Sequence, residues 1–188
     1  MTAAGGDPRA ERTRSGLRAA LLAECAQRPL DQVSVSAVAR RAGVGRATFY
    51  LHYQDLQALA VDACAEVARE AVEALHAWRG IPDPAAPPPA MVEFFARVGD
   101  RADLYRSLLL PAGAGPLGEL LNRELRERSR AERTLVGAPH PDVVASAVAG
   151  AFTTLLADWL HDPDPAAPPV ASGQAWRLLI ALNRTPFD

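Results

Sequence analysis

Apolar residues recur at helical spacing along almost the whole chain, and no stretch alternates between apolar and polar positions as a half-buried strand does. In the first segment, for example, Leu17, Ala20, Leu21 and Cys25 fall on one stripe. The pattern predicts an all-α protein. Nine segments carry it, at residues 9–27, 35–42, 46–53, 55–78, 90–99, 101–110, 116–135, 141–160 and 169–183.

The predicted helices fall into two groups. Three short ones come first, and the long helix over 55–78 then leads into a larger helical body. Proline-rich connectors at 81–89 and 161–169 interrupt the body, because proline lacks the amide donor that a helix interior needs. We therefore expect an N-terminal domain over residues 1–55 and a C-terminal helical domain over residues 56–188.

The segment "RRAGVGRATFYLHY", residues 40–53, stops one helical pattern and restarts another. Ser34 stands where a capping residue is expected at the start of the preceding short helix. Gly43 lies just past the end of that helix, where a left-handed backbone favours glycine. Val44 is expected to fill the turn. Two short helices joined by a tight turn that contains glycine predict a helix-turn-helix.

The second of these helices has a polar outer surface. With Phe49 at the centre of its buried face and about 100° per residue, Tyr53 lies about 40° away and also faces the core. Ala47 and Leu51 point outward, and Thr48 and Tyr50 lie on the two flanks. A helix that enters the major groove of DNA needs this layout, with outer residues for base edges and flanking hydroxyls for phosphates.

The segment "VSVSAVARRAGVGRATFYLHYQDLQAL", residues 33–59, closely resembles the N-terminal DNA-binding region of the TetR family of bacterial transcriptional regulators. The matching positions are Ser34, Val38, Ala39, Ala42, Gly43, Val44, Tyr50, His52 and Tyr53. Two positions depart from the family pattern: Gly45 stands where serine is usual, and Leu56 where lysine is usual. Both departures predict weaker anchoring to phosphates without loss of the fold.

The resemblance implies a repressor that binds a palindromic operator as a homodimer and leaves it when a small-molecule effector binds the body. It implies no enzymatic activity and no cofactor. On this basis we expect DNA contacts from seven residues, namely Ser34, Arg46, Ala47, Thr48, Tyr50, Leu51 and His52.

For some of these residues the side chain suits one kind of DNA contact, and for others it leaves two readings open. Arg46 suits either a guanine edge or a phosphate. Leu51 suits a thymine methyl group, although exposed leucines are also tolerated without any role. Thr48, Tyr50 and Ser34 suit phosphates. His52 suits a phosphate contact or a packed imidazole.

The arginines of "RAERTR" form a further candidate contact. Arg9, Arg12 and Arg14 lie ahead of or within the first helix, and such an arm can follow the DNA backbone or enter a narrow minor groove. A frayed, solvated terminus is the alternative.

The charge distribution favours a polyanionic partner at the N-terminal end. The net charge is −2, but the balance is +4 over residues 1–53 and −6 over the remaining residues. No run reaches the roughly 18 uninterrupted apolar residues of a membrane span, and the polar N-terminus has no signal core. Cys25 and Cys64 lack metal or redox spacing and indicate reduced thiols in a cytoplasmic protein. We expect no metal site.

The body offers two further features. In residues 141–160, Ala145, Ser146, Ala149 and Gly150 form a cluster of small residues, and with residues 171–182 this helix predicts a four-helix interface between two copies. Packing within one chain is the alternative. The acidic residues Asp62, Glu66, Glu70 and Glu73 have the spacing of a solvated helix face.

The candidates for an effector pocket are mainly aromatic, although aromatic residues at helical spacing more often belong to a core. They are Cys64, Phe94, Phe95, Tyr105 and Trp159, with His76 and Trp78 nearby.

Two other functions remain open on the sequence. A helical enzyme or ligand carrier would need a catalytic or metal-binding set, and no such motif is present. A protein-binding adaptor that keeps the fold without sequence-specific DNA binding would explain Leu51, Leu56 and the missing serine and lysine.

Overall fold

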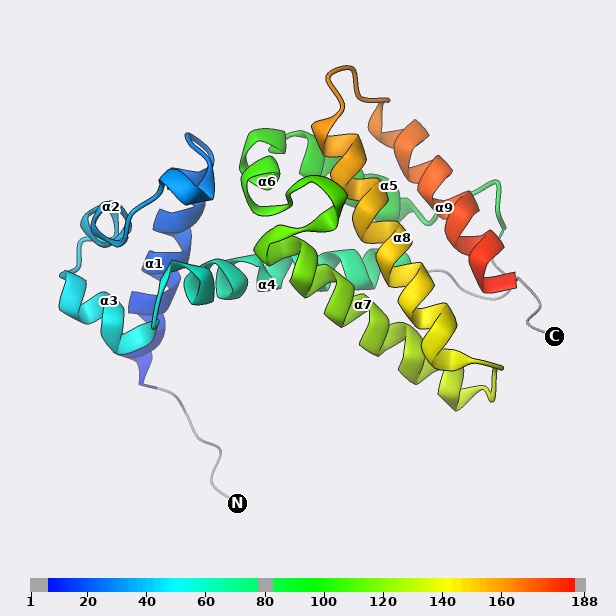
Figure 1. Cartoon of the computed structure of the whole chain (residues 1–188), viewed down its shortest axis with the longest axis horizontal. Coiled ribbons are helices and arrows are strands. Elements are labelled where there is room, and N and C mark those ends of the chain that lie inside the picture. The colour runs from blue at the N-terminus through cyan, green and yellow to red at the C-terminus, as the bar shows by residue number, and fades with distance from the viewer. Residues whose placement is uncertain (1–6, 78–82, 185–188) are drawn as a thin grey trace.

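The computed structural model describes residues 7–77 and 83–184, and its secondary structure over these residues is almost entirely α-helical (Figure 1). This confirms the predicted fold class. The helices are α1 (Pro8–Cys25), α2 (Val35–Arg41), α3 (Arg46–His52), α4 (Leu56–Leu75), α5 (Pro89–Gly99), α6 (Ala102–Leu108), α7 (Gly115–Leu135), α8 (Pro141–His161) and α9 (Pro168–Arg184). Short 3-10 turns at Leu30–Gln32 and Pro111–Gly113 were not predicted.

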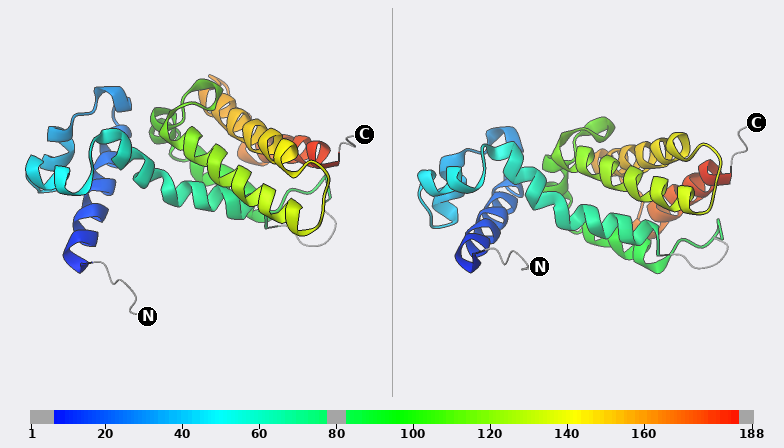
Figure 2. Two further views of the ribbon diagram at one scale, coloured as in Figure 1. Left: turned by 60° about the horizontal axis from the view of Figure 1, so that its bottom comes forward. Right: turned by 90° about the horizontal axis from the view of Figure 1, so that it is seen from below.

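The first three helices form a small head at one end of the body, and α4 runs from one to the other (Figures 1 and 2). Leu17, Leu21, Val38 and Phe49 are fully buried and form the centre of the head. Because α1 contacts α2, α3 and α4, it is the element around which the head is assembled.

Helix α4 belongs to both parts. The Asp55 carboxylate accepts a hydrogen bond from the Ala58 amide at 2.8 Å and caps its first turn. Its buried stripe includes Leu59, Cys64, Val67 and Ala71. The helix packs against α1 in the head and against α5 and α7 in the body, so one continuous helix connects the two parts.

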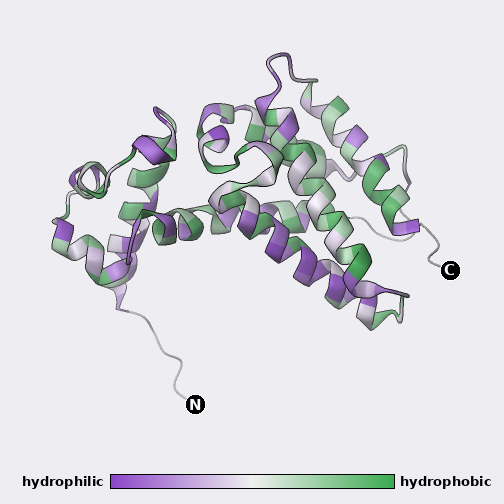
Figure 3. Ribbon diagram, in the orientation of Figure 1, coloured by the Kyte–Doolittle hydropathy of each residue, from purple (hydrophilic) through white to green (hydrophobic). Residues whose placement is uncertain are grey.

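The body is built around α8, which lies between α7 and α9. Its aromatic core joins Phe94 and Phe95 of α5 to Phe152 of α8, with ring centroids 6.0–6.2 Å apart. Figure 3 shows the contrast between the hydrophilic ribbon of α7 and the more hydrophobic one of α8. By length and composition alone α8 is able to cross a membrane, but half of its apolar window is buried inside the protein, as in a core helix.

Candidate nucleic-acid interface

The turn between α2 and α3 has the predicted geometry. The Ser34 hydroxyl accepts a hydrogen bond from the Ala37 amide at 3.2 Å and caps α2. Gly43 has φ +70°, in the left-handed region where a side chain is strained. The Val44 amide then donates to the Ala39 carbonyl at 3.0 Å and closes the turn. Residues 35–52 therefore form a helix-turn-helix.

The outer face of α3 carries the residues expected to contact DNA. Phe49 is fully buried, whereas Leu51 is 82% exposed and Tyr50 is 50% exposed. Arg46 and Ala47 are also exposed, and Thr48 and His52 are half-buried on the flanks. Ser34, at the start of α2, is exposed as well. The structure brings all seven predicted residues to the helix-turn-helix surface, and it does not test whether they touch DNA.

Tyr53 was predicted to be the last residue of the second short helix, but its backbone is not helical. Helix α3 ends at His52, and Tyr53 follows in an extended conformation. Its ring is still buried and lies 6.0 Å from that of Phe49, so it anchors α3 as expected, although it does so from outside the helix.

Asp62 was assigned by sequence to a solvated helix face, and that assignment was wrong. Its carboxylate accepts a hydrogen bond from the Tyr53 hydroxyl and another from the Arg18 guanidinium at 3.0 Å. Arg18 also contacts Glu11 at 2.7 Å. Burial, reinforced by the hydrogen bond to Asp62, raises the pKa of Tyr53, so the hydroxyl stays protonated and donates. This network ties the end of α3 to α1 and α4.

A second ion-pair network joins α1 to α2. The buried Glu24 carboxylate accepts from Arg41 at 2.6 Å and lies 3.2 Å from Arg28. The hydrogen bond from Arg41 holds the pKa of Glu24 below its usual range. Sequence reasoning missed this pair, although Glu24 falls between Leu21 and Cys25 on the apolar stripe of α1, which is a signal for a buried acid.

Two arginines on the helix-turn-helix are not engaged in this way. Among the described residues, neither Arg40 nor Arg46 has a carboxylate within 4.0 Å. Both are exposed, and both side chains are therefore available to a phosphate or a base. Arg41, by contrast, is held by Glu24.

The predicted N-terminal arm takes a different form. Helix α1 begins at Pro8, with Asp7 as its cap, so Arg9, Arg12 and Arg14 all lie within its first two turns. These three residues are helical and do not form a free arm. Arg12 donates to the Pro8 carbonyl at 3.1 Å, and Arg14 lies 4.0 Å from Glu11.

The predicted pocket residues do not line one shared cavity. Phe94 and Phe95 are buried in the aromatic core, and the ring of Trp159 packs 5.1 Å from that of Phe95. Only Cys64 and Tyr105 line a common cavity, of about 140 Å³, between α4 and α6. Three of these aromatic rings therefore pack in the core, as aromatic residues at helical spacing more often do, and ligand binding by any of the candidates stays a prediction. Trp78 lies outside the described residues.

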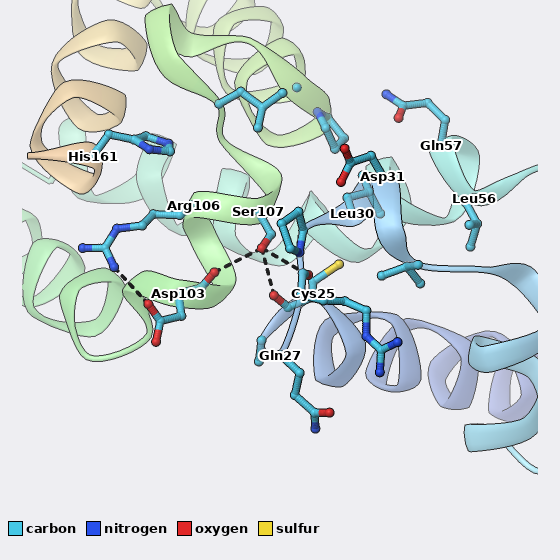
Figure 4. Close-up of a pocket in the computed structure, with 17 residues that line it drawn as sticks. Cys25, Gln27, Leu30, Asp31, Leu56, Gln57, Asp103, Arg106, Ser107 and His161 are labelled. Carbon is cyan, nitrogen blue, oxygen red and sulfur yellow. Dashed lines mark hydrogen bonds and ion pairs between the residues drawn. The ribbon is translucent and has the colours of Figure 1, made fainter.

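A large hollow lies between the head and the body (Figure 4). It is an open groove of about 930 Å³ bordered by the end of α1, the 3-10 turn that follows it, and α6. On one side the Ser107 hydroxyl donates to the Cys25 carbonyl at 2.9 Å, which links α6 directly to α1. Arg106 contacts the Leu160 carbonyl at 2.5 Å and Asp103 at 2.9 Å.

The small residues of α8 are divided between two environments. Ala145 and Ala149 are fully buried within the chain, so for them the alternative of internal packing holds. Ser146 is exposed and Gly150 is half-buried, on a side that also presents Val143. No three His, Cys, Asp or Glu side chains gather as a metal site in the described part of the chain.

The comparisons with known proteins agree with this architecture. Residues 17–63 match the sequence model of "Bacterial regulatory proteins, tetR family", and no curated protein sequence matches the chain significantly. A TetR transcriptional regulator from Rhodococcus sp. RHA1 is 17% identical, with a TM-score of 0.64 over 93% of this chain and 98% of that one.

Two other solved structures are similar over nearly their whole length. A TetR transcriptional regulator from Streptococcus agalactiae 2603V is 18% identical, with a TM-score of 0.62 over 91% of this chain and 95% of that one. The TetR family repressor AlkX from Dietzia sp. strain DQ12-45-1b is 21% identical, with a TM-score of 0.61 over 96% and 99%. Residues 17–63 of this chain thus resemble the tetR family of bacterial regulatory proteins, and the chain as a whole has the fold of the solved TetR transcriptional regulators.

Proposed function

We propose that this protein is a transcriptional repressor that binds a palindromic operator as a homodimer and is released from it by a small molecule. The observation that carries the proposal is the outer face of α3. Its apolar side is anchored by Phe49, while Arg46, Tyr50 and Leu51 stand exposed on a helix-turn-helix that matches the tetR family. We assign DNA binding to residues 1–55 and ligand binding and dimerisation to residues 56–188.

The contacts follow from where each side chain lies. Arg46, on the first turn of α3, approaches a base edge or a phosphate. Leu51 meets a thymine methyl group, which would cover an otherwise exposed side chain. Tyr50, Thr48 and the Ser34 hydroxyl contact phosphates on the walls of the groove. Ala47 allows close approach of the helix, and His52 contacts a phosphate from the flank.

The proposed dimer uses the exposed sides of α8 and α9. On α8 this side presents Val143, Ser146 and Gly150, and on α9 it presents Val170 and Leu178, each about half exposed. Apolar and small residues at helical spacing on two neighbouring helices suit a two-fold four-helix contact. Two heads held by one interface would read the two halves of a palindrome.

Release by an effector requires the body to move the head. Helix α4 runs through both parts, and the hydrogen bond from Ser107 to the Cys25 carbonyl joins α6 to α1. A ligand that shifts α4 or α6 would therefore change the separation of the two α3 helices. We place this activity in the cytoplasm, where an operator is accessible.

A salt titration with duplex DNA tests the proposal. Neutralised phosphates release counterions, so the affinity of a DNA-binding head falls steeply as salt is raised. We expect Arg46→Ala and Tyr50→Phe each to weaken binding, with a shallower salt slope if the lost contact is to a phosphate. Weak binding at low salt that does not change with either substitution would contradict DNA binding by α3.

An adaptor function is the second candidate, and the exposure of Leu51 beside Tyr50 favours it. Leucine at the centre of a protein contact buries apolar area. In that case, a protein partner would compete with DNA for the exposed face of α3. DNA binding would then be weak at every salt concentration.

A further inference from the structure

The distal end of the body contains a further cavity. Among the predicted pocket residues that the structure describes, His76 is the one that lines it. It has a volume of about 350 Å³ and lies between the end of α4, the second half of α7, α8 and α9. This volume is within the range of about 300–1,000 Å³ that is typical of small-molecule sites. Apolar side chains form most of its wall, including Leu75, Leu125, Val148, Trp176, Leu179 and Ile180.

One end of the cavity is polar and carries a positive charge that no carboxylate of a described residue neutralises. Arg133 lines it, and no carboxylate of a described residue lies within 4.0 Å of the guanidinium. Nη1 donates to the Asn183 side chain at 2.9 Å, while Nε is buried without a hydrogen-bond partner in the described part of the chain. Leaving a buried donor unpaired is unfavourable, so an acceptor placed here is favoured.

The neighbouring acid does not neutralise this arginine. Glu132 accepts from Arg128 at 2.6 Å and lies 3.4 Å from His76, so its carboxylate is already engaged. Ser129, one helical turn before Arg133 on α7, adds a buried hydroxyl to the same wall. Trp176 donates its indole N–H to the Asp83 carbonyl at 2.7 Å and thus offers the cavity mainly apolar surface.

We propose that this cavity binds an amphipathic carboxylate, with the anionic group at Arg133 and Ser129 and the apolar part against Trp176 and the leucines. An arginine guanidinium is suited to a carboxylate because its N–H groups form a planar fork. A cation would be repelled by the charge of Arg133, and a fully apolar molecule would leave the guanidinium without an anionic partner. The inference rests on the proposed function, in which the body binds the effector.

Calorimetric titration of the full chain with decanoate and with decan-1-ol tests the site. The two probes share an apolar chain and differ in the anionic group. We expect decanoate to bind at least tenfold more tightly than decan-1-ol. Arg133→Met should weaken decanoate binding at least tenfold and leave decan-1-ol unchanged. Arg126→Met, on the exposed side of the same helix, should bind both probes as the wild type does.

Equal affinities for the two probes, no binding of either, or no effect of Arg133→Met on decanoate would overturn the proposal. If Arg133→Met does not fold, the preference of the wild-type protein for decanoate over decan-1-ol decides the matter. DNA binding is measured in parallel. Decanoate binding that leaves DNA affinity unchanged would uphold the site and contradict release by this ligand. Intact DNA binding without decanoate binding would contradict the site alone.

Discussion

The Tyr53 hydroxyl donates a hydrogen bond to the Asp62 carboxylate and so joins the end of α3 to the second turn of α4. The same carboxylate accepts from Arg18 of α1. The orientation of α3 is therefore set by two contacts: the packing of Phe49 and Tyr53 in the core, and a polar network at the edge of that core. The network also lies on the route by which α4 would transmit a movement of the body.

Tyr53→Phe is expected to destabilise the protein modestly. It removes one hydrogen bond but keeps the ring in the core and leaves Arg18 bound to Asp62, so the expected loss is about 1 kcal/mol. For a chain of this length that lowers the thermal midpoint by about 2–4 °C. Tyr50→Phe is the matched control, because the Tyr50 hydroxyl forms no such bond: it should keep the midpoint and lose affinity for DNA. Equal midpoints for the two variants would contradict a stabilising role for Tyr53.

The two glycines of the turn should respond in opposite directions to serine. Neither would bring a new Cβ within 4 Å of another group, but Gly43 has φ +70° and Gly45 has φ −77°. Gly45→Ser would supply the side-chain cap that α3 lacks and is expected to stabilise by a few tenths of a kcal/mol. Gly43→Ser would strain the backbone by roughly 1 kcal/mol.

Denaturant titration of both glycine variants separates these effects. The hydroxyl of Gly45→Ser should also strengthen DNA binding, because the departure from the family pattern is reversed at that position. A Gly43→Ser protein as stable as the wild type would show that the left-handed conformation is not required.

The Glu24 network predicts a loss of stability in acid. Because Arg41 lowers the pKa of Glu24 in the folded protein, its stabilisation is complete above the unfolded-state pKa, about 4.3. It disappears as the pH falls through the lower folded-state pKa. Between pH 7 and pH 3, the free energy of unfolding should therefore change less with pH in Glu24→Gln than in the wild type.

Arginine substitutions provide the control for this network. Arg41→Met leaves a buried carboxylate unpaired on one side and should destabilise the head, whereas Arg40→Met removes an exposed arginine without an ion pair and should not. Equal losses of stability in Arg41→Met and Arg40→Met would indicate that these arginines act through the overall charge of the head and not through the ion pair with Glu24.

Both cysteines should be unreactive in the folded protein. Burial raises the pKa of Cys25 to about 11 and that of Cys64 to about 12, so neither thiol ionises near neutral pH. A thiol reagent at pH 8 is expected to modify neither residue until denaturant unfolds the chain, and to modify both afterwards. Rapid modification of the folded protein would mean that the head and α4 open readily.

The helices and the exposed face of α3 could be predicted because both depend on local rules. Apolar spacing places α1 to α9, and the capping of Ser34 and the backbone of Gly43 follow from residue type. By contrast, the roles of Asp62 and Glu24 depend on which helices become neighbours. Helical spacing predicts on which side of its helix an acidic residue lies. It does not predict which arginine or tyrosine of another helix will lie opposite that residue.

The dispersal of the pocket candidates has a related reason. Phe94 and Phe95 share the apolar pattern of core residues, and the structure places them in the core with Phe152. The distal cavity was missed because its polar members come from different helices. Ser129 offered the one available signal, since it continues the stripe of Leu117, Leu121 and Leu125 on α7 with a hydroxyl.

Selection of duplex DNA from a random pool by the purified protein tests the central claim most directly. The account predicts enrichment of a palindromic consensus with two half-sites about one helical turn apart, or a multiple of it. Arg46→Ala should then lose discrimination at one position in each half-site while the fold is retained. No enrichment of any sequence, or the same consensus and affinity for Arg46→Ala, would contradict sequence reading by α3.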